Sequence, residues 1–255
     1  MATIPRFTET DRGEARFFFT MALVMAAAIV AGFAFNLAIG RSSFSLPWLV
    51  HFHAWVMMGW VGLYLMQNTL VFADNIALHR RLGWLSVVWL PLILVMGVLI
   101  TRWSLQTKGG PPFFDQNQFL VSNPLQLFGA VVLAGWAVTV RRNTGWHRRL
   151  MYCAFAVFTG PGIGRLLPSP LLIPYAWYVE ACLPPIVFAI IGIVADNRRY
   201  GRVHPAWFWG IGMVVGMQIL ADLIAYSDAG VAFTHQVIAG TPGATRSMAA
   251  FFPPS

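Results

Sequence analysis

Four ionisable side chains stand inside long apolar stretches of this sequence: His53, Arg165, Glu180 and Asp222. Counted along helices from one end of each stretch, all four lie within ~14 Å of the same membrane surface. A charge at the bilayer centre costs ~2.5–3.5 kcal/mol on insertion scales, so such groups usually face a bundle interior or a wet cavity. We therefore expect these residues to line a polar pocket in the outer half of a membrane domain.

The same four residues suit acid–base or electrostatic chemistry on a lipophilic substrate. Such chemistry needs a semi-buried acid and a partner, and Glu180 with Arg165 and His53 supplies both, so we treat the four as candidate catalytic residues. The structural alternative is that Arg165 and one acid form an ion pair, beside a hydrogen-bonded interior histidine.

A metal site is a second interpretation of three of them. His53, Glu180 and Asp222 provide the nitrogen and oxygen ligands that suit iron, zinc or manganese. Since no HExxH-type spacing is present, the site depends on these residues converging in space.

Histidine placement raises the question of haem. His79, His147 and His204 stand beside arginines near one membrane surface, while His51, His53 and His235 belong to the other side. Two such groups are compatible with a two-haem electron-transfer protein, although no stretch carries two histidines one leaflet apart. For a cofactor such as haem b, the candidate binding residues are His79, His147, His204, Tyr64, Gln67 and Gln218.

Several other chemistries are excluded. The only lysine, Lys108, lies between apolar stretches, so retinal in its usual linkage is excluded. Cys153 and Cys182 occur without a CxxC or CxxCH motif, which excludes covalent c-type haem and suggests two buried thiols. No nucleophile elbow, P-loop or Rossmann signature is present.

Composition indicates that membrane helices position these residues. The 255 residues are 58% hydrophobic and only 10% charged, against about 25% charged in soluble domains. A membrane-spanning helix needs ~20 apolar residues. Seven stretches qualify, and the predicted fold is an all-α integral membrane bundle with spans at 17–39, 49–73, 82–101, 121–140, 149–169, 171–195 and 205–226.

Basic residues alternate with the loops between these spans. Five of the 17 lie on one side, namely Arg41, Arg102, Lys108, Arg165 and Arg246. The other side holds Arg6, Arg12, Arg16, Arg80, Arg81, Arg141, Arg142, Arg148, Arg149, Arg198, Arg199 and Arg202. This bias predicts a cytoplasmic N-terminus and an outer C-terminus in a bacterial inner membrane. It also explains the net charge of +8 without a nucleic-acid partner.

The expected organisation is a cytoplasmic tail at 1–16, a seven-helix domain at 17–226 and an outer tail at 227–255. The apolar part of that last tail, or the long third loop, is a candidate cap for the outer face. "HRRLGW" from His79 and "HRRLMY" from His147 form a weak internal echo. A duplication or a shared headgroup-anchoring motif would explain the echo.

Helical periodicity assigns directions to the polar residues. His53, Trp60, Tyr64 and Gln67 recur on one face, which we expect to point inward, while His51 lies on another face near the interface. Gln218 and Asp222 are i, i+4 neighbours that can hydrogen-bond.

Helix-breaking residues flank the two interior charges. In "EACLPP", Pro184 and Pro185 cannot donate to the carbonyls of Glu180 and Ala181, and "TGPGIGR" loosens the helix before Arg165. Broken helices around a polar site are typical of transporters, while small residues also serve helix packing.

Taken together, the motifs FHAW…Q, HRRLGW, HRRLM…R and GRVHPA resemble a widespread group of bacterial multi-pass membrane proteins over about 48–220. The HRxLG element is also loosely similar to b561-like membrane cytochromes. The resemblance implies roles for His53, Gln67, His79, His147, Arg165, His204 and Gln218. The group's pattern has a basic residue where this chain has Asp222.

The leading expectation is a redox-linked membrane protein that binds a lipophilic ligand or cofactor in the outer-leaflet pocket, with membrane oxidoreductase as the matching enzyme class. Haem b and a His/carboxylate-bound metal are the cofactors to which the residues point. One alternative is a transporter or ligand sensor that moves its kinked fifth and sixth helices. Another is an accessory subunit of a larger membrane complex. The expected partners are the lipid bilayer and a lipophilic small molecule, with a homo-oligomer or larger complex as further assemblies.

Overall fold

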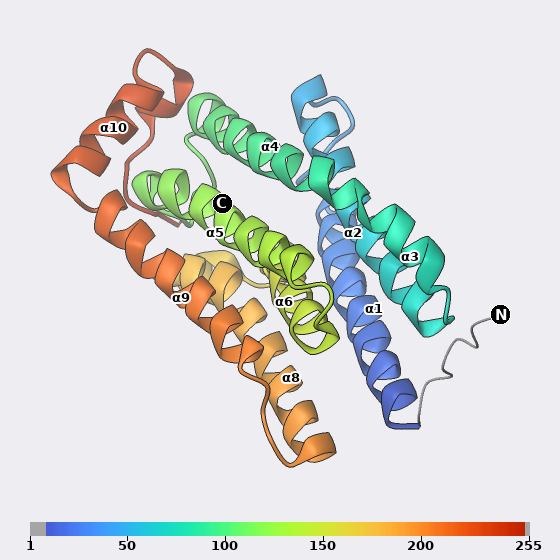
Figure 1. Ribbon diagram of the computed structural model, residues 1–255. Helices are drawn as coiled ribbons and strands as arrows, with labels where there is room; N and C mark the ends of the chain where they lie inside the picture. Colours follow the sequence, from blue (N-terminus) through green and yellow to red (C-terminus); the bar gives the residue numbers. More distant parts are fainter. Residues whose placement is uncertain (1–8, 253–255) are drawn as a thin grey trace.

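The computed structural model describes residues 9–252, with side chains from Arg12 onward, so Arg6 lies outside the described residues. This part of the chain is helical and contains no strand (Figure 1). Its α-helices are α1 (Glu9–Ala38), α2 (Trp48–Phe72), α3 (Ile76–Gly83), α4 (Leu85–Lys108), α5 (Gln116–Thr139), α6 (Thr144–Ala156), α7 (Thr159–Gly164), α8 (Leu183–Tyr200), α9 (Ala206–Ala225) and α10 (Asp228–Ile238). A π turn, Tyr178–Cys182, leads into α8, and 3₁₀ turns cover Ser169–Leu172 and Pro242–Thr245.

Six helices are long and apolar enough to cross a membrane. They are Arg12–Ala38, Trp48–Phe72, Leu85–Lys108, Gln116–Thr139, Tyr178–Tyr200 and Ala206–Ala225. The predicted helical membrane bundle is confirmed at this level. Large apolar side chains such as Val88 and Leu223 are exposed on its flanks, which suits contact with lipid tails.

The predicted span 149–169 differs from the other six because it is two helices, α6 and α7. At the junction, Phe158 N–H donates to Phe155 O, a tightened i to i−3 bond. Pro161 has no N–H to continue the ladder, and three glycines weaken helix propensity. Apolar composition predicted one continuous span here, but the backbone cannot sustain it.

The first helix also begins earlier than expected. Residues 1–16 were predicted to form a tail, but α1 begins at Glu9, and Glu14 is buried. The chain near Glu14 is thus part of the bundle.

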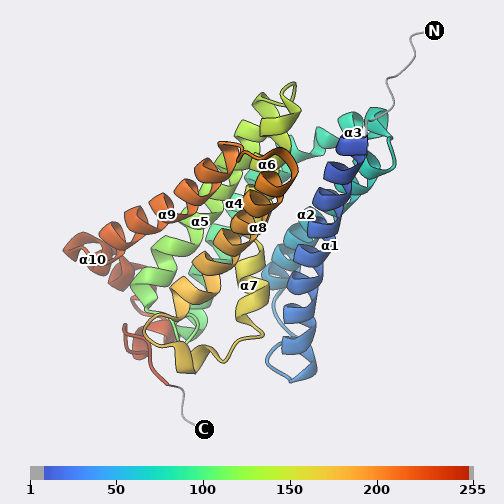
Figure 2. The ribbon, with the colours of Figure 1, turned by 90° about the horizontal axis from the view of Figure 1, so that it is seen from below.

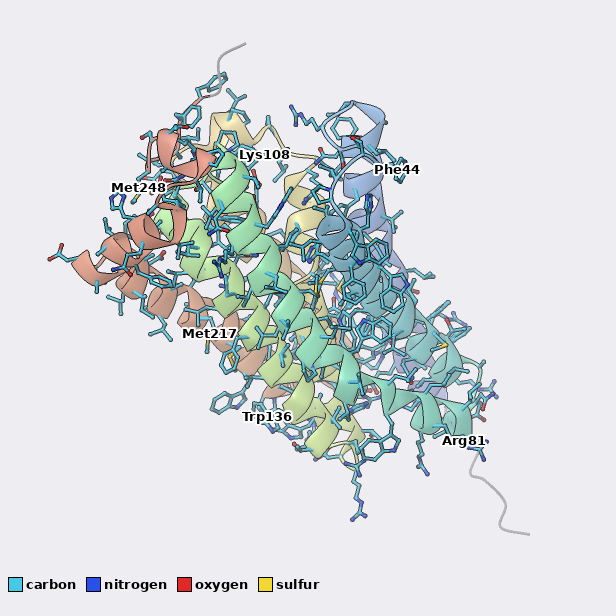
Figure 3. All side chains as sticks on the ribbon, turned by 90° about the horizontal axis from the view of Figure 1, so that it is seen from above. Phe44, Arg81, Lys108, Trp136, Met217 and Met248 are labelled. Carbon is cyan, nitrogen blue, oxygen red and sulfur yellow. The ribbon has the colours of Figure 1, made fainter. Side chains whose placement is uncertain are left out.

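The helices form two flanks around a central group. α1 and α2 lie on one side, α9 and α10 on the other, and α4 to α8 lie between them (Figures 1 and 2). Aromatic rings fill the interior, for example Tyr64 stacked on Phe155 with ring centroids 3.8 Å apart. Figure 3 shows Phe44, Lys108 and Met248 toward one end of the bundle and Arg81 toward the other.

The C-terminal segment closes the end of the bundle that carries the α4–α5 loop. Arg246 donates to the carbonyls of Gly109, Pro111, Pro112 and Phe114. Gln106 of α4 donates to Val237 O of α10 at 2.9 Å. The C-terminal segment and the long loop therefore form this cap together.

Close helix packing depends on the glycines of α7. Gly162 meets α1 where Gly32 stands, and a Cβ built on Gly32 would lie 1.9 Å from Gly162 O. On the other face, Cβ atoms at Gly160 and Gly164 would approach Glu180 to 2.9 and 2.6 Å. These glycines let α7 fit between α1 and the π turn, as small residues do in membrane interfaces.

Gly32→Ala is expected to destabilise the protein by roughly 1–3 kcal/mol, since the added methyl cannot be accommodated by backbone atoms. The measurement is the thermal unfolding midpoint in detergent. Gly62→Ala is the control, because a Cβ there meets nothing within 4 Å. Equal midpoints for the two variants would contradict the close α1–α7 contact.

Candidate functional site

Gln218 of α9 is the centre of a buried hydrogen-bond network. Its Oε1 accepts from Trp177 Nε1 at 2.7 Å and Gln126 Nε2 at 3.3 Å, and its Nε2 donates to Ser122 Oγ at 3.1 Å. Gln218 also donates to Asp222 Oδ1 at 2.9 Å, so the predicted i, i+4 bond is confirmed. The network joins α5, α9 and the turn before α8.

Sequence reasoning missed Trp177, Gln126 and Ser122. Each is a neutral polar residue within an apolar stretch, so a search for charged residues in the spans does not find it. "SNPLQ" holds Ser122 and Gln126 at helical spacing of i, i+4, which was the available signal.

Asp222 is held at the outer end of this network. Its Oδ2 accepts from Tyr178 Oη at 3.1 Å, and its Oδ1 accepts from Gln118 Nε2 at 3.4 Å. The carboxylate also lines an open pocket of about 430 Å³ with Ile219, Leu223, Tyr226 and Ser227. One acid therefore reaches both the buried network and an apolar surface pocket.

His53, Arg165 and Glu180 come together around α7. The Arg165 guanidinium donates to Pro161 O at 2.5 Å and lies 4.0 Å from the Phe33 ring centroid. It interacts electrostatically with both His53 and Glu180. The structure thus brings three of the four predicted pocket residues into one neighbourhood, and Asp222 contacts Tyr178, which belongs to the same π turn as Glu180.

Two polar atoms of this neighbourhood are unpaired. Within residues 12–252, His53 Nδ1 and Glu180 Oε1 are buried and have no hydrogen-bond partner. The ion pair between Arg165 and an acid, which was the structural alternative to a pocket, does not form among these residues. Glu180 is instead enclosed by the glycines of α7, and its carbonyl belongs to the π turn that Leu183 N–H closes on Tyr178 O.

The predicted metal triad is not assembled. No group of three His, Cys, Asp or Glu side chains in the described part of the chain could hold a metal ion. The Asp222 carboxylate is instead bonded to Gln118, Gln218 and Tyr178.

The inward face predicted for α2 is confirmed in part. Trp60 and Tyr64 are buried, while Trp55 on the His51 face is 58% exposed. His51 binds Phe44 O at 3.2 Å, as an interfacial residue can. Tyr64 packs on Phe155.

At the opposite end of the bundle, the "HRR" histidines meet. The His79 and His147 ring centroids are 6.2 Å apart at 81°. His147 Nδ1 lies 2.8 Å from Ala137 O. The side-chain nitrogen of Gln67 donates to His79 O and Nδ1 when the amide is oriented so that its oxygen accepts from Gly83 N–H. His204 lies instead against Trp146, with centroids 5.2 Å apart, so the predicted trio is a pair and a separate residue. The haem and redox expectations stay predictions.

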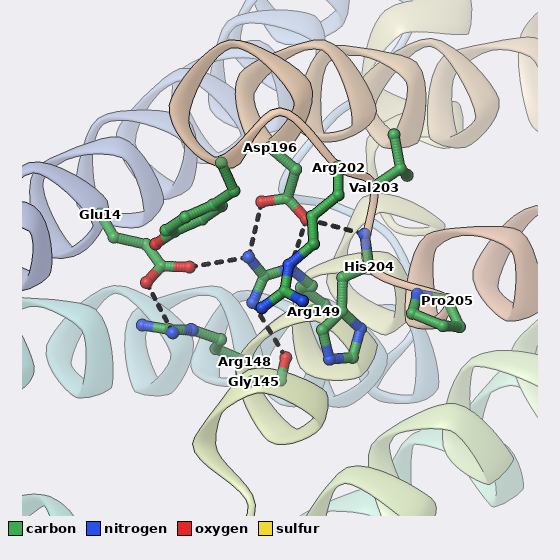
Figure 4. Close-up of a pocket in the computed structure, with 10 residues that line it drawn as sticks. Glu14, Gly145, Arg148, Arg149, Asp196, Arg202, Val203, His204 and Pro205 are labelled. Carbon is green, nitrogen blue, oxygen red and sulfur yellow. Dashed lines mark hydrogen bonds and ion pairs between the residues drawn. The ribbon is translucent and has the colours of Figure 1, made fainter.

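A buried ion cluster was missed entirely, and Figure 4 shows it. Arg149 of α6 donates through Nε and Nη2 to Asp196 of α8 at 2.7 and 2.5 Å, and through Nη2 to Glu14 of α1 at 2.8 Å. Trp207 Nε1 of α9 donates to Asp196 at 2.7 Å. Glu14 and Asp196 fell just outside predicted spans and Arg149 at the first residue of one, where each was interpreted as tail, loop or topology signal.

The two "HRR" sequences therefore make different contacts. Arg149 is buried, but Arg81 at the corresponding position is exposed. The echo places two histidines together without giving two equivalent sites.

Comparison with known proteins found no matching family model, no matching curated protein and no matching solved structure.

The histidine pair predicts a pH-dependent stability. Burial, and secondly His147, lowers the pKa of His79 from its ordinary 6.5. As pH falls below about 6.5, His79 binds a proton in the unfolded chain but stays neutral in the folded chain. Protonation therefore stabilises the unfolded chain, and the free energy of unfolding should fall. His79→Gln should flatten this loss, measured as the change in unfolding midpoint between about pH 7 and about pH 5.

His235→Gln is the matched control, because His235 is exposed on α10. It should keep the wild-type slope. An unchanged slope in His79→Gln would show that the pair does not cause the pH dependence.

Proposed function

We propose that the chain crosses the bacterial inner membrane seven times, with its N-terminus in the cytoplasm. The support is the charge bias, and the course of α6 and α7, which run in succession between the ends of the bundle (Figure 2). At the usual helical rise, Thr144–Gly164 spans about 30 Å, the thickness of a bilayer core. The α6–α7 pair is the fifth crossing along the chain, and it raises the six long helices to seven crossings.

Cysteine labelling tests the topology. Ser42→Cys and Ala244→Cys, both at exposed positions, should react with a membrane-impermeant maleimide in intact spheroplasts, and Ala73→Cys should react only after lysis. The wild-type protein is the control, because Cys153 and Cys182 are buried. Labelling of Ala73→Cys before lysis would refute the orientation, and protection of Ala244→Cys would refute the odd number of crossings.

We further propose that the protein binds a lipophilic ligand in the outer half of the membrane, at the pocket beside Asp222. The observation that carries this proposal is a carboxylate placed in the wall of an open pocket of about 430 Å³ among Ile219, Leu223 and Tyr226. A charged group facing apolar surroundings is costly and is usually functional in a membrane protein.

The surroundings of Asp222 favour a ligand with a hydrogen-bond donor. Gln118, Gln218 and Tyr178 occupy three acceptor positions of the carboxylate, which has about four. The remaining position suits an amine or hydroxyl head, and exposed Ile219 and Leu223 suit an alkyl chain. The network behind Asp222 holds the acid in place before a ligand arrives.

Asp222→Asn should weaken binding of a long-chain alkylamine roughly tenfold or more, because it replaces a charge-assisted hydrogen bond by a neutral one. Binding is measured by native mass spectrometry of the detergent-solubilised protein. The corresponding alcohol should bind more weakly, and the carboxylate weakest. Asp228→Asn, one turn beyond α9, is the charge-matched control and should leave binding unchanged.

Equal binding of amine and carboxylate, or equal effects of Asp222→Asn and Asp228→Asn, would refute the proposal.

A second candidate function is transport, favoured because the α6–α7 break and the π turn before α8 pack against each other. Proteoliposomes separate the two, since a binding protein holds the alkylamine and a transporter releases it into the lumen.

A further inference from the structure

A second cavity, of about 580 Å³, lies where the ends of α1, α6, α8 and α9 meet (Figure 4). It is lined by the buried ion cluster, the α8–α9 loop and the first turn of α6. It is at the opposite end of α9 from Asp222, so it is independent of the ligand pocket proposed above.

The carboxylates of this cavity are already engaged. Asp196 Oδ2 accepts from Arg149, Trp207 and the His204 backbone N–H, and Asp196 Oδ1 accepts from Arg149. Glu14 accepts from Arg149 and forms a 2.5 Å ion pair with Arg148. Two carboxylates therefore face three guanidinium groups, since Arg202 also lines the cavity.

Arg202 supplies the excess charge. Among residues 12–252 no side chain or carbonyl is paired with it, and it stands on the α8–α9 loop over the cavity (Figure 4). A guanidinium in this position presents a planar fork of donors, a shape that matches phosphate oxygens.

His204 adds a neutral donor. Its Nδ1 accepts from Ala206 N–H at 3.1 Å, which leaves the ring proton on Nε2. Burial, and then Arg149, lowers the pKa of His204, so the ring is neutral at pH 7. Its Nε2 lies near Gly145, where a Cβ would stand 3.1 Å away, so the glycine leaves this nitrogen open to the cavity.

We propose that this cavity binds a phosphate group, either on an anionic phospholipid headgroup or as a free phosphate. Arg202 and His204 Nε2 supply the donors, and the floor is the ion cluster in which Glu14 and Asp196 balance the charges of Arg148 and Arg149. A basic pocket between helix ends at a membrane surface is a setting in which proteins bind phospholipid headgroups.

The test compares Arg202→Gln with Arg198→Gln, which removes the same charge from an exposed position on the preceding helix outside the cavity. The protein in nanodiscs is titrated with phosphatidate, with phosphatidylcholine and with inorganic phosphate, and bound ligand is counted by native mass spectrometry. Arg202→Gln should weaken phosphatidate binding roughly tenfold, and Arg198→Gln should change it less than about twofold.

The arms of the experiment identify the source of the phosphate. Arg202-dependent binding of phosphatidate alone supports a lipid headgroup site, and the same dependence with inorganic phosphate supports a soluble ligand. Equal binding of phosphatidate and phosphatidylcholine, or equal effects of the two variants, would overturn the proposal. Since both variants carry a surface substitution, the unfolding midpoint confirms that each is folded.

Discussion

The arrangement of the helices depends on the hydrogen-bonded ion pairs that the Arg149 guanidinium forms. The guanidinium joins α6 to Asp196 of α8 and Glu14 of α1, and Asp196 in turn binds Trp207 of α9. Removing one partner of such a buried pair typically costs about 3–5 kcal/mol, because the remaining charge stays buried without compensation. The cluster therefore specifies which helix ends meet, more than it adds to net stability.

Apart from the Gln218 network, many contacts between helices are made by rings and small residues. α7 is the clearest case. With Gly162 against α1 and Gly160 and Gly164 against the π turn, the helix offers backbone instead of side chains to both neighbours. A broken helix can be tolerated at this depth because protein surrounds it on both faces.

The helical membrane class and six of the spans followed from composition, because apolar length alone decides whether a helix can cross a bilayer. The inward position of Trp60 and the Gln218–Asp222 bond followed from helical period. Both are properties of one helix, which a sequence encodes directly.

Contacts between helices could not be obtained in the same way. Trp177 and Gln126 reach Gln218 from other elements, and nothing in their own stretches indicates that convergence. Glu14, Arg149 and Asp196 were misjudged because a charge beside a predicted span is usually solvated, whereas here three helix ends bury their charges against one another. The meeting of His53, Arg165 and Glu180 has the same origin, since depth along a single helix does not establish which helices are neighbours.

The Arg246 contacts have a consequence for how the chain is assembled. The carbonyls that Arg246 binds belong to the loop after α4, which is synthesised long before Arg246 itself. Gly109 and Gly110, both with positive φ, give that loop its turned course toward the Arg246 side chain. Until the segment around Arg246 emerges, these carbonyls lack that partner, so the loop should reach its final form only after α5 to α10 have been synthesised. Arg246 thereby makes the shape of an early loop depend on a segment that is synthesised much later.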